Sequence, residues 1–392
     1  MEVVYSRETF PLAWKKSIFL AGPTPQKAEV KSWRSEALRI LKTFGYDGVV
    51  FVPEDRGGGI YENFNYREQV EWEHKALNAA DCILFWVPRN LEMLPGFTTN
   101  VEFGLYVHLG KSVLGYPPEA EKIKYLDLVA EKNDIPILHT LQETIEKCLD
   151  LLNPGAMRVG GERDVPLRIW RTGTFQLWYR AQKRVGNRID GAVLKWIHRV
   201  GKNREHIFSF AMHLNIHIAS ENRNKTNEIL ISRPDIATVI LYTRALDILQ
   251  SRVILVREFR TPASTPDCYI WELPGGSPAK PNSDPYSVAA EEVYEETGFK
   301  CEPKRFQAHG ARQLAGTFTA HKAHLFSVEL TEKEMQWFIS QRGVVHGADL
   351  DNPTGERTYI EVKTVKEILS ERLLDWSNIG KILSVLTEKG DE

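Results

Sequence analysis

The chain has 392 residues, of which 42% are hydrophobic and 26% charged, with a formal net charge of −2. These values are typical of a soluble globular protein with two domains, and they exclude an overall polyanion-binding character. No apolar run approaches the roughly 20 residues of a membrane helix, and we expect no secretory signal. The four cysteines form no C-x-x-C pair, so we expect a cytoplasmic protein without zinc or a disulfide framework.

Residues 1–152 alternate short apolar runs with helical patterns. This rhythm predicts a doubly wound α/β domain with a flavodoxin-like parallel sheet, whose ligand crevice lies at the carboxyl ends of the strands. Strands are expected at residues 17–21, 49–52, 83–87 and 112–116, and helices at residues 33–41, 68–79 and 101–109.

Residues 153–204 are interpreted as a helical connector that is rich in tryptophan and strongly basic. One interpretation is a basic face that meets an acidic neighbouring surface, and the other is a phosphate- or nucleic-acid-binding surface. Between residues 166 and 204 the basic residues stand against a single acid, Asp190, and are Arg168, Arg171, Arg180, Lys183, Arg184, Arg188, Lys195, Arg199, Lys202 and Arg204.

Residues 205–392 change to strands separated by turns, which predicts an α+β domain with a mixed sheet. A Pro-Gly-Gly turn and an acidic helix follow the fourth strand, and another helix closes the chain at residues 379–388. The strands are expected at residues 229–231, 236–242, 253–258, 269–273, 322–329 and 358–362.

The acidic helix places Glu292, Glu295 and Glu296 at positions i, i+3 and i+4, so the three carboxylates share one face. Their mutual repulsion is tolerable if a hard cation such as Mg²⁺ or Mn²⁺ binds them through oxygen. Such a metal would polarise phosphoryl oxygens and ready a water for attack on a diphosphate. Gly298 is expected to end the helix in a left-handed cap. The alternative is a solvated acidic helix face.

The sequence W-E-L-P-G-G at residues 271–276, followed by A-A-E-E-V-Y-E-E-T-G-F at residues 289–299, resembles the Nudix hydrolase signature. The resemblance implies an α/β/α sandwich and metal-dependent hydrolysis. Two positions depart from the signature, because Glu291 replaces its arginine and Asn282 stands where its early glutamate is expected. Asp284 is a candidate substitute for that glutamate.

The surrounding sequence is similar to the ADP-ribose and ADP-sugar pyrophosphatase branch of that family. The matching stretch V-I-L-V-R-E-F-R ends at Arg260, and Glu272 lies on the next strand. The resemblance implies that Arg260 and Glu272 contact the nucleotide or its terminal sugar, whereas an ordinary surface ion pair is the alternative. Glu356, in a loop before a predicted strand, is a candidate general base for activating water.

Two carboxylates are candidates for chemistry in the N-terminal domain. Glu102 is expected in the first turn of a helix capped by Thr98, Thr99 or Asn100, where the positive helix end favours an ionised nucleophile. Glu73 lies on the helix before the preceding strand. Two carboxylates facing one crevice can divide the work on a glycosidic bond, one attacking the anomeric carbon and the other protonating the leaving base. A helix salt bridge is the alternative for Glu73.

The N-terminal domain resembles the nucleoside 2-deoxyribosyltransferase superfamily, which includes nucleotide N-glycosidases. The matching motifs are I-F-L-A-G-P at residues 18–23, the helix around Trp72 and Glu73, A-D-C-I-L-F-W at residues 80–86, and N-V-E-F-G at residues 100–104. Glu102 falls on the family's nucleophile. Phe19 stands where many members carry a tyrosine, and Gly96 stands where many carry an aspartate. Phe19 and Trp86 are candidate substrate contacts, with a core position as the alternative for Trp86.

These features predict a bifunctional enzyme of nucleotide metabolism. One half would hydrolyse a nucleoside diphosphate derivative with Mg²⁺ or Mn²⁺, and the other would cleave or transfer an N-glycosidic bond through a glycosyl–Glu102 intermediate. The alternative is a nucleotide-binding or sensing protein in which one or both domains lack catalysis. We expect a small-molecule nucleotide or nucleoside substrate, no membrane or nucleic-acid partner, and a homo-oligomer by resemblance to both families.

Overall fold

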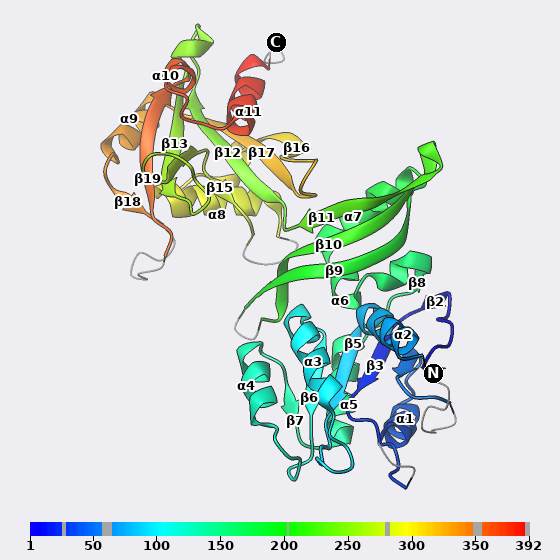
Figure 1. The fold of residues 1–392 in the computed structure, drawn as a ribbon. Helices are drawn as coiled ribbons and strands as arrows, with labels where there is room; N and C mark the ends of the chain where they lie inside the picture. The colour runs from blue at the N-terminus through cyan, green and yellow to red at the C-terminus, as the bar shows by residue number, and fades with distance from the viewer. Residues whose placement is uncertain (26–28, 57–64, 202–203, 279–282, 348–354, 389–392) are drawn as a thin grey trace. The chain divides into compact units, whose positions relative to one another are not determined.

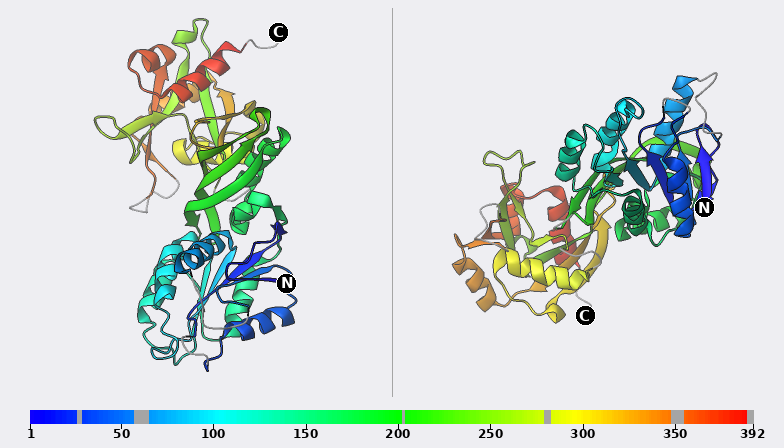
Figure 2. Two further views of the ribbon diagram at one scale, coloured as in Figure 1. Left: turned by 45° about the vertical axis from the view of Figure 1, so that its right-hand side comes forward. Right: turned by 90° about the horizontal axis from the view of Figure 1, so that it is seen from below.

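A computed structural model describes residues 1–25, 29–56, 65–201, 204–278, 283–347 and 355–388. The chain forms two compact units, Met1–Ser232 and Arg233–Glu392, each with its own sheets and helices (Figures 1 and 2). Within the described ranges, no helix combines the length and the apolar character needed to cross a bilayer. The division between the units lies after the expected boundary at residues 204–205.

The first unit is built on a parallel sheet of six strands, as the alternating pattern predicted (Figure 1). Strand β3 lies between β4 and β5, and the chain winds outward from β3 in both directions. The point where the winding reverses therefore lies between the carboxyl ends of β3 and β5, where such sheets bind ligands. In sheet order the strands are β1 (Glu2–Tyr5), β4 (Val49–Val52), β3 (Ser17–Ala21), β5 (Cys82–Trp86), β6 (Ser112–Gly115) and β7 (Ile137–Leu138).

Helices cover both faces of this sheet because its strands carry apolar side chains on both sides. Ile18 and Leu20 pack with helices α1 (Arg34–Thr43) and α5 (Leu141–Leu152). Phe19 and Phe85 point to the opposite face, toward α2 (Tyr66–Ala79) and α3 (Phe97–Tyr106). Helix α4 (Lys124–Lys132) and a 3₁₀ turn, η1 (Val107–Leu109), complete this layer.

The connector differs from the expected helical segment. It contains helices α6 (Leu167–Trp170) and α7 (Gly173–Arg184), but the basic residues after α7 enter a long strand. Strands β9 (Arg188–Val200), β10 (His206–Ile218) and β11 (Arg223–Ser232) form an antiparallel sheet that belongs to the first unit. One face of this sheet is apolar, with Leu194, Phe210, Met212 and Leu214 buried. Charged residues lie between these apolar residues in the sequence, so we did not predict strands β9 and β10 from the sequence.

Strand β2 (Ala13–Trp14) pairs with β8 (Arg158–Val159), which leads into the turn η2 (Gly160–Asp164).

The second unit contains the predicted mixed sheet. Strand β12 pairs in parallel with β17 and antiparallel with β13, which in turn pairs antiparallel with β19. The sheet order is β16 (Gln307–Gln313), β17 (Lys322–Glu329), β12 (Ile236–Thr243), β13 (Arg252–Phe259), β19 (Thr358–Thr364) and β18 (Val345–His346), with β14 (Tyr269–Glu272) on β13 and β15 (Gly275–Gly276) on β12.

Two pairs of helices pack on opposite faces of this sheet. Helices α8 (Pro285–Thr297) and α9 (Glu332–Ser340) bury Val239 and Ile254, whereas α10 (Val365–Ser370) and α11 (Trp376–Thr387) bury Ile240 and Leu255. The result is a helix–sheet–helix layering. Gly298 ends α8 with a φ of 69°, which confirms the predicted left-handed cap.

Candidate functional site

Glu102 lies in the second turn of α3, not in its first turn as expected. The helix begins at Phe97 because Gly96 adopts the left-handed conformation, with a φ of 61°, and serves as the N-cap residue without a side-chain cap bond. Thr98, Thr99 and Asn100 therefore lie inside the helix instead of capping it. The field of a helix terminus falls off within one turn, so it contributes less to the charge of Glu102 than expected.

The carboxyl group of Glu102 favours its protonated form. Burial, assisted by the neighbouring Glu73, raises its pKa to about 8, while the positive charge of Arg34 acts in the opposite direction. Burial therefore opposes the ionised Glu102 that the sequence led us to expect. Glu102 in turn contributes, after burial, to a raised pKa of Tyr106.

Glu73 lies in the middle of α2, and its pKa responds to burial and to the charge of Arg34, as the pKa of Glu102 does. Its Oε1 accepts a hydrogen bond of 2.7 Å from Nε2 of Gln69, whose own Oε1 accepts from the hydroxyl of Ser6. Burial raises the pKa of Glu73, and the Gln69 hydrogen bond and Arg34 partly offset that rise. The structure thus brings together the two carboxylates that the sequence singled out, and orients Glu73 through a buried amide.

Arg34 is the residue of this site that sequence reasoning missed. It is the first residue of α1, its exposed fraction is 1%, and its charge acts on both Glu73 and Glu102. Its Nη1 lies 2.5 Å from Oε1 of Glu54, in the loop after β4. One indication of this role is present in the sequence. Arg34 begins the helix that follows the buried strand at residues 17–21, which places it at the carboxyl edge of the sheet.

The loops that follow β3 and β5 touch each other at this edge. A Cβ atom on Gly22 would lie 2.1 Å from the carbonyl oxygen of Trp86, and one on Gly96 would lie 2.7 Å from Cγ of Pro23. Both positions also have positive φ values. Close approach and backbone conformation together explain why glycine, and not aspartate, occupies position 96.

Phe19 and Trp86 belong to the core and not to a substrate-contacting surface. Phe19 is fully buried, and its ring centroid lies 6.5 Å from that of Trp72 in an aromatic cluster beneath α2. Trp86 is 7% exposed and packs with the residues that α1 and α5 cover. Alternation along a strand buried on both faces places each ring in a helix-covered layer.

In the second unit, Arg260 gathers three carboxylates. Its Nε lies 2.9 Å from Oε1 of Glu272, and its Nη1 lies 3.4 Å from Oε1 of Glu356. Its Nη2 lies 2.8 Å from Oε2 of Glu258, a buried residue that the sequence reading missed. The signal for Glu258 was its spacing of two from Arg260 at the end of a strand, which places both side chains on one face.

Two of these carboxylates, together with Glu296 of α8, form a potential metal-ligating group. Oxygen atoms of Glu258, Glu296 and Glu356 lie within 4.8 Å of one another. Glu296 is buried on α8, and its Oε2 accepts a hydrogen bond of 2.9 Å from the amide of Gly275. An all-carboxylate donor set fits a hard cation such as Mg²⁺ or Mn²⁺.

Glu292 and Glu295 flank this group. A Cβ atom on Gly276 would lie 2.6 Å from Oε1 of Glu292, so the glycine makes room for that carboxylate. Glu295 is exposed at the edge of the cluster and shares its electrostatic field with Glu356. Of the three expected metal ligands, Glu296 lies in the close group, while Glu292 and Glu295 lie beside it.

Crowding and burial shift the titration of the cluster. Burial, with help from Glu356 against the opposing charge of Arg260, raises the pKa of Glu258 to about 8. Burial and then Glu295 raise the pKa of Glu292 to about 7, and burial holds the pKa of Glu296 well above its usual range. Negative charge at these positions needs either protons or a cation to compensate it.

Asp284, the candidate substitute for the early signature glutamate, is the N-cap residue of α8. Its carboxylate accepts a hydrogen bond of 3.0 Å from the amide of Ser287 and so caps the helix. Asn282, where the early signature glutamate was expected, lies outside the described residues.

Comparison with protein-family models gives a match in the first unit. Residues 15–120 match the family described as nucleoside 2-deoxyribosyltransferase like. This segment runs from β3 to just beyond β6 and includes Arg34, Glu73 and Glu102. A search of curated proteins gives no match to the chain.

Part of the connector docks on helices α4 and α5 of the first unit, which lie beyond the matched segment, through arginines that bind the carbonyl ends of these helices. Arg171 donates to the carbonyls of Leu151 and Leu152 at the end of α5, at 3.2 and 2.5 Å. Arg199 donates to the carbonyl of Asn133, the C-cap residue of α4, at 3.0 Å. Helix C-termini carry partial negative charge, so these arginines are stabilised without an acidic side chain.

Proposed function

We propose that the first unit cleaves or transfers the N-glycosidic bond of a nucleoside or nucleotide. The family match and the electrostatic pairing of Glu73 with Glu102 in the matched segment support this function. The pairing is the observation on which the proposal depends, because it joins Glu102, which by resemblance of its motif falls on the family's nucleophile, to a second buried carboxyl group.

The proposed reaction divides the work between the two carboxyl groups. The carboxylate of Glu102 attacks the anomeric carbon, and the bond between that carbon and the base nitrogen breaks as its electron pair moves to the base. In the reacting state Glu73 carries the proton and donates it to the leaving base, and Glu102 has lost the proton that burial favours in the free protein. Water or a second base then takes the glycosyl group from Glu102, giving a proton back to Glu73.

We further propose that the second unit hydrolyses a nucleoside diphosphate derivative. Support comes from the resemblance of residues 271–299 to the Nudix signature and from the close group of Glu258, Glu296 and Glu356. These three residues, with Glu292 and Glu295 beside them, would hold Mg²⁺ or Mn²⁺. A bound divalent ion supplies polarisation of phosphoryl oxygens and acidification of a water.

The residues around the cluster have separate proposed tasks. Glu356 is exposed and its Oε1 contacts Arg260, and we assign to its carboxylate the task of accepting a proton from the attacking water. Arg260 and Glu272 would contact the nucleotide or its terminal sugar. Because both activities would lie on one chain, we propose that they act in sequence on one substrate. The second unit would produce a nucleoside monophosphate, and the first unit would then cleave its N-glycosidic bond.

The experiment is a nucleotide-library screen with Mg²⁺ that measures nucleoside monophosphate and free base in parallel. Glu102→Ala is expected to abolish release of free base while hydrolysis of the diphosphate persists, and Glu295→Gln is expected to lower that hydrolysis without lowering base release from a supplied monophosphate. If neither variant changes turnover, the bifunctional proposal fails.

The rival function is nucleotide binding or sensing without catalysis. Glu291 in place of the signature arginine, and the buried Phe19 in place of a tyrosine, favour it. In that case nucleotides would raise the thermal stability of the wild type and of both variants without turnover.

A further inference from the structure

The guanidinium of Arg34 holds the loop that follows the first buried strand. Its Nε donates to the carbonyl of Leu20 at 3.0 Å, and its Nη2 donates to the carbonyl of Gly22 at 2.7 Å. Its Nη1 donates to Oγ1 of Thr24 at 3.2 Å and contacts the carbonyl of Pro23 at 3.4 Å. One buried side chain therefore fixes the backbone path of residues 20–24.

This loop packs against the end of β5 and the start of the helix that carries Glu102. Gly22 lies against the carbonyl of Trp86 at the end of β5, and Pro23 lies against Gly96 at the start of α3. Helix α3 carries Glu102, so a shift of the loop would be transmitted to the helix that presents the nucleophile. The loop also lies where the strand order reverses, at the edge that binds ligands in such sheets.

Arg34 also provides positive charge beside the two carboxyl groups. The charged and titratable groups around it come from three elements: Glu54 in the loop after β4, Glu73 with its neighbour His74 on α2, and Glu102 on α3. Glu54 contacts the guanidinium at 2.5 Å and accepts a hydrogen bond of 2.8 Å from Oγ of Ser32. The guanidinium is buried, so solvent screens its charge little.

We propose that Arg34 is a positioning residue of the glycosyl site, which fixes the loop at residues 20–24 and stabilises negative charge on Glu102. The inference rests on the proposed function of the first unit. Attack on the anomeric carbon needs an ionised Glu102, and burial opposes that ionisation. Arg34 supplies the compensating charge while its five hydrogen-bond contacts keep it from approaching the substrate.

A purely structural role for Arg34 makes a different prediction. Loop fixation alone would change the Michaelis constant and the stability, and it would leave the titration of Glu102 unchanged. Charge stabilisation shifts the pH at which base release rises. The pH profile therefore separates the two roles.

The experiment measures kcat/KM for base release from pH 5 to 9.5 in four variants. Arg34→Met is expected to move the midpoint of the rising limb upward by about one pH unit. Arg34→Lys keeps the charge without the planar fork, so we expect a raised KM with a smaller shift. Glu54→Gln removes the carboxylate that neutralises Arg34, so its midpoint should move downward.

Arg39→Met is the matched control, because Arg39 is exposed on the same helix and pairs with Glu36. Its midpoint should equal that of the wild type. An Arg34→Met midpoint equal to the control would overturn the proposal. If Arg34→Met does not fold, a Glu54→Gln midpoint that fails to move downward overturns it instead.

A second readout separates this inference from the function on which it rests. The ¹³C resonance of the Glu102 carboxyl group, assigned with Glu102→Gln, reports its titration without any substrate. If base release survives Glu102→Gln, the proposed function fails whatever Arg34 does. If base release depends on Glu102 but its titration is the same in wild type and Arg34→Met or Glu54→Gln, the inference alone fails.

Discussion

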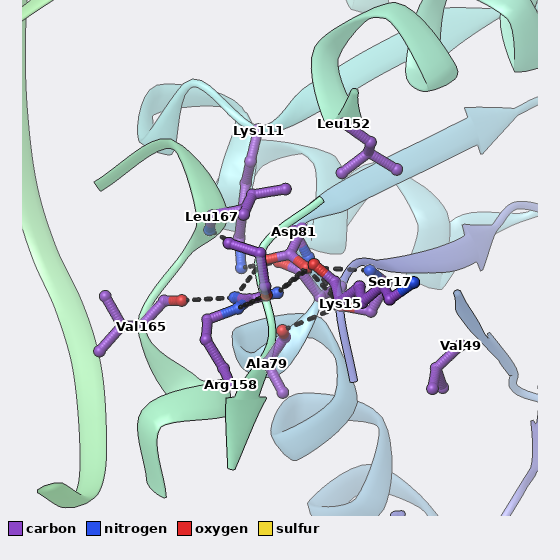
Figure 3. Close-up of polar contacts among 12 residues, drawn as sticks. Lys15, Ser17, Val49, Ala79, Asp81, Lys111, Leu152, Arg158, Val165 and Leu167 are labelled. Carbon is purple, nitrogen blue, oxygen red and sulfur yellow. Dashed lines mark hydrogen bonds and ion pairs between the residues drawn. The ribbon is translucent and has the colours of Figure 1, made fainter. Parts of the chain in front are cut away.

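Asp81 and Arg158 form a fully buried ion pair across 77 residues of chain, with Oδ2 and Nη2 2.5 Å apart (Figure 3). Asp81 precedes β5, and its carboxylate also accepts hydrogen bonds from the amides of Ser17 and Leu167 at 2.9 and 2.8 Å. Arg158 in turn donates to the carbonyl of Val165 at 2.7 Å. This pair ties the amino edge of the parallel sheet to the connector and leaves the carboxyl edge open for the glycosyl site.

Loss of this pair should destabilise the first unit strongly. Asp81→Asn leaves the buried guanidinium of Arg158 without a compensating charge, so we expect a loss of about 3–5 kcal/mol in the free energy of unfolding. Chemical denaturation measures it. Asp47→Asn, which breaks a partly exposed pair with Lys16, is the control and should cost less than about 1 kcal/mol. Equal losses in both variants would show that Asp81 is not a structural anchor.

A divalent cation should stabilise the second unit through Glu296. Binding at a hundredfold excess over the dissociation constant adds about 2.7 kcal/mol to the stability of the folded state. Glu296→Gln removes a carboxylate of the close group, so the thermal shift with Mn²⁺ should be lost. Glu302→Gln, at an exposed pair with Lys304, should retain it. A full shift in Glu296→Gln would place the cation elsewhere.

Affinity for that cation should rise with pH. Glu292 and Glu258, with pKa values raised to about 7 and about 8, must lose protons before they contribute negative charge. Calorimetric titration with Mn²⁺ should show tighter binding at pH 8.5 than at pH 6. Binding at pH 6 should release protons, seen as a dependence of the heat on the ionisation enthalpy of the buffer. Identical affinities at both pH values would contradict the protonated cluster.

Glu102 should make the first unit less stable as pH rises. Its folded pKa of about 8 lies above its ordinary value of 4.5, so the folded state binds the proton more tightly. The resulting stability is fully present below pH 4.5 and is lost as pH rises through about 8. The thermal midpoint of Glu102→Gln minus that of wild type should therefore grow from pH 5 to pH 8.5. A difference independent of pH would mean that Glu102 titrates normally.

The sequence predicted those parts of the fold that depend on local patterns. The strands at residues 17–21, 49–52 and 322–329 match the structure residue for residue, because their apolar runs are bounded by clear breaks. It failed for β9, where two arginines and a lysine lie among the apolar residues and register shifts in the pairing with β10 break the alternation. It also failed for the start of α3, because Gly96 caps that helix through its backbone conformation and not through a capping side chain.

Site residues could be predicted from the sequence where they belong to a recognisable motif. Residues that join a site only through contacts between distant parts of the chain could not. Glu73 and Glu102 lie on separate helices yet influence each other. Arg260 pairs with Glu272, which is the ion pair that the sequence left open as the alternative to a nucleotide contact, and its contact with Glu356 was not predicted. Arg34 and Glu258 carry no motif of their own. Their roles emerge from packing, since each becomes important by lying beside carboxylates that are distant in sequence.

The most direct test is to look for the glycosyl group on Glu102. Wild-type protein is mixed with a nucleotide that releases free base, quenched in acid within one turnover, digested and analysed by mass spectrometry. The account predicts a peptide containing Glu102 that is heavier by one glycosyl group in the wild type and unmodified in Glu102→Gln. Rapid base release without any such adduct, or the same adduct in Glu102→Gln, would contradict the central claim that this carboxylate attacks the sugar.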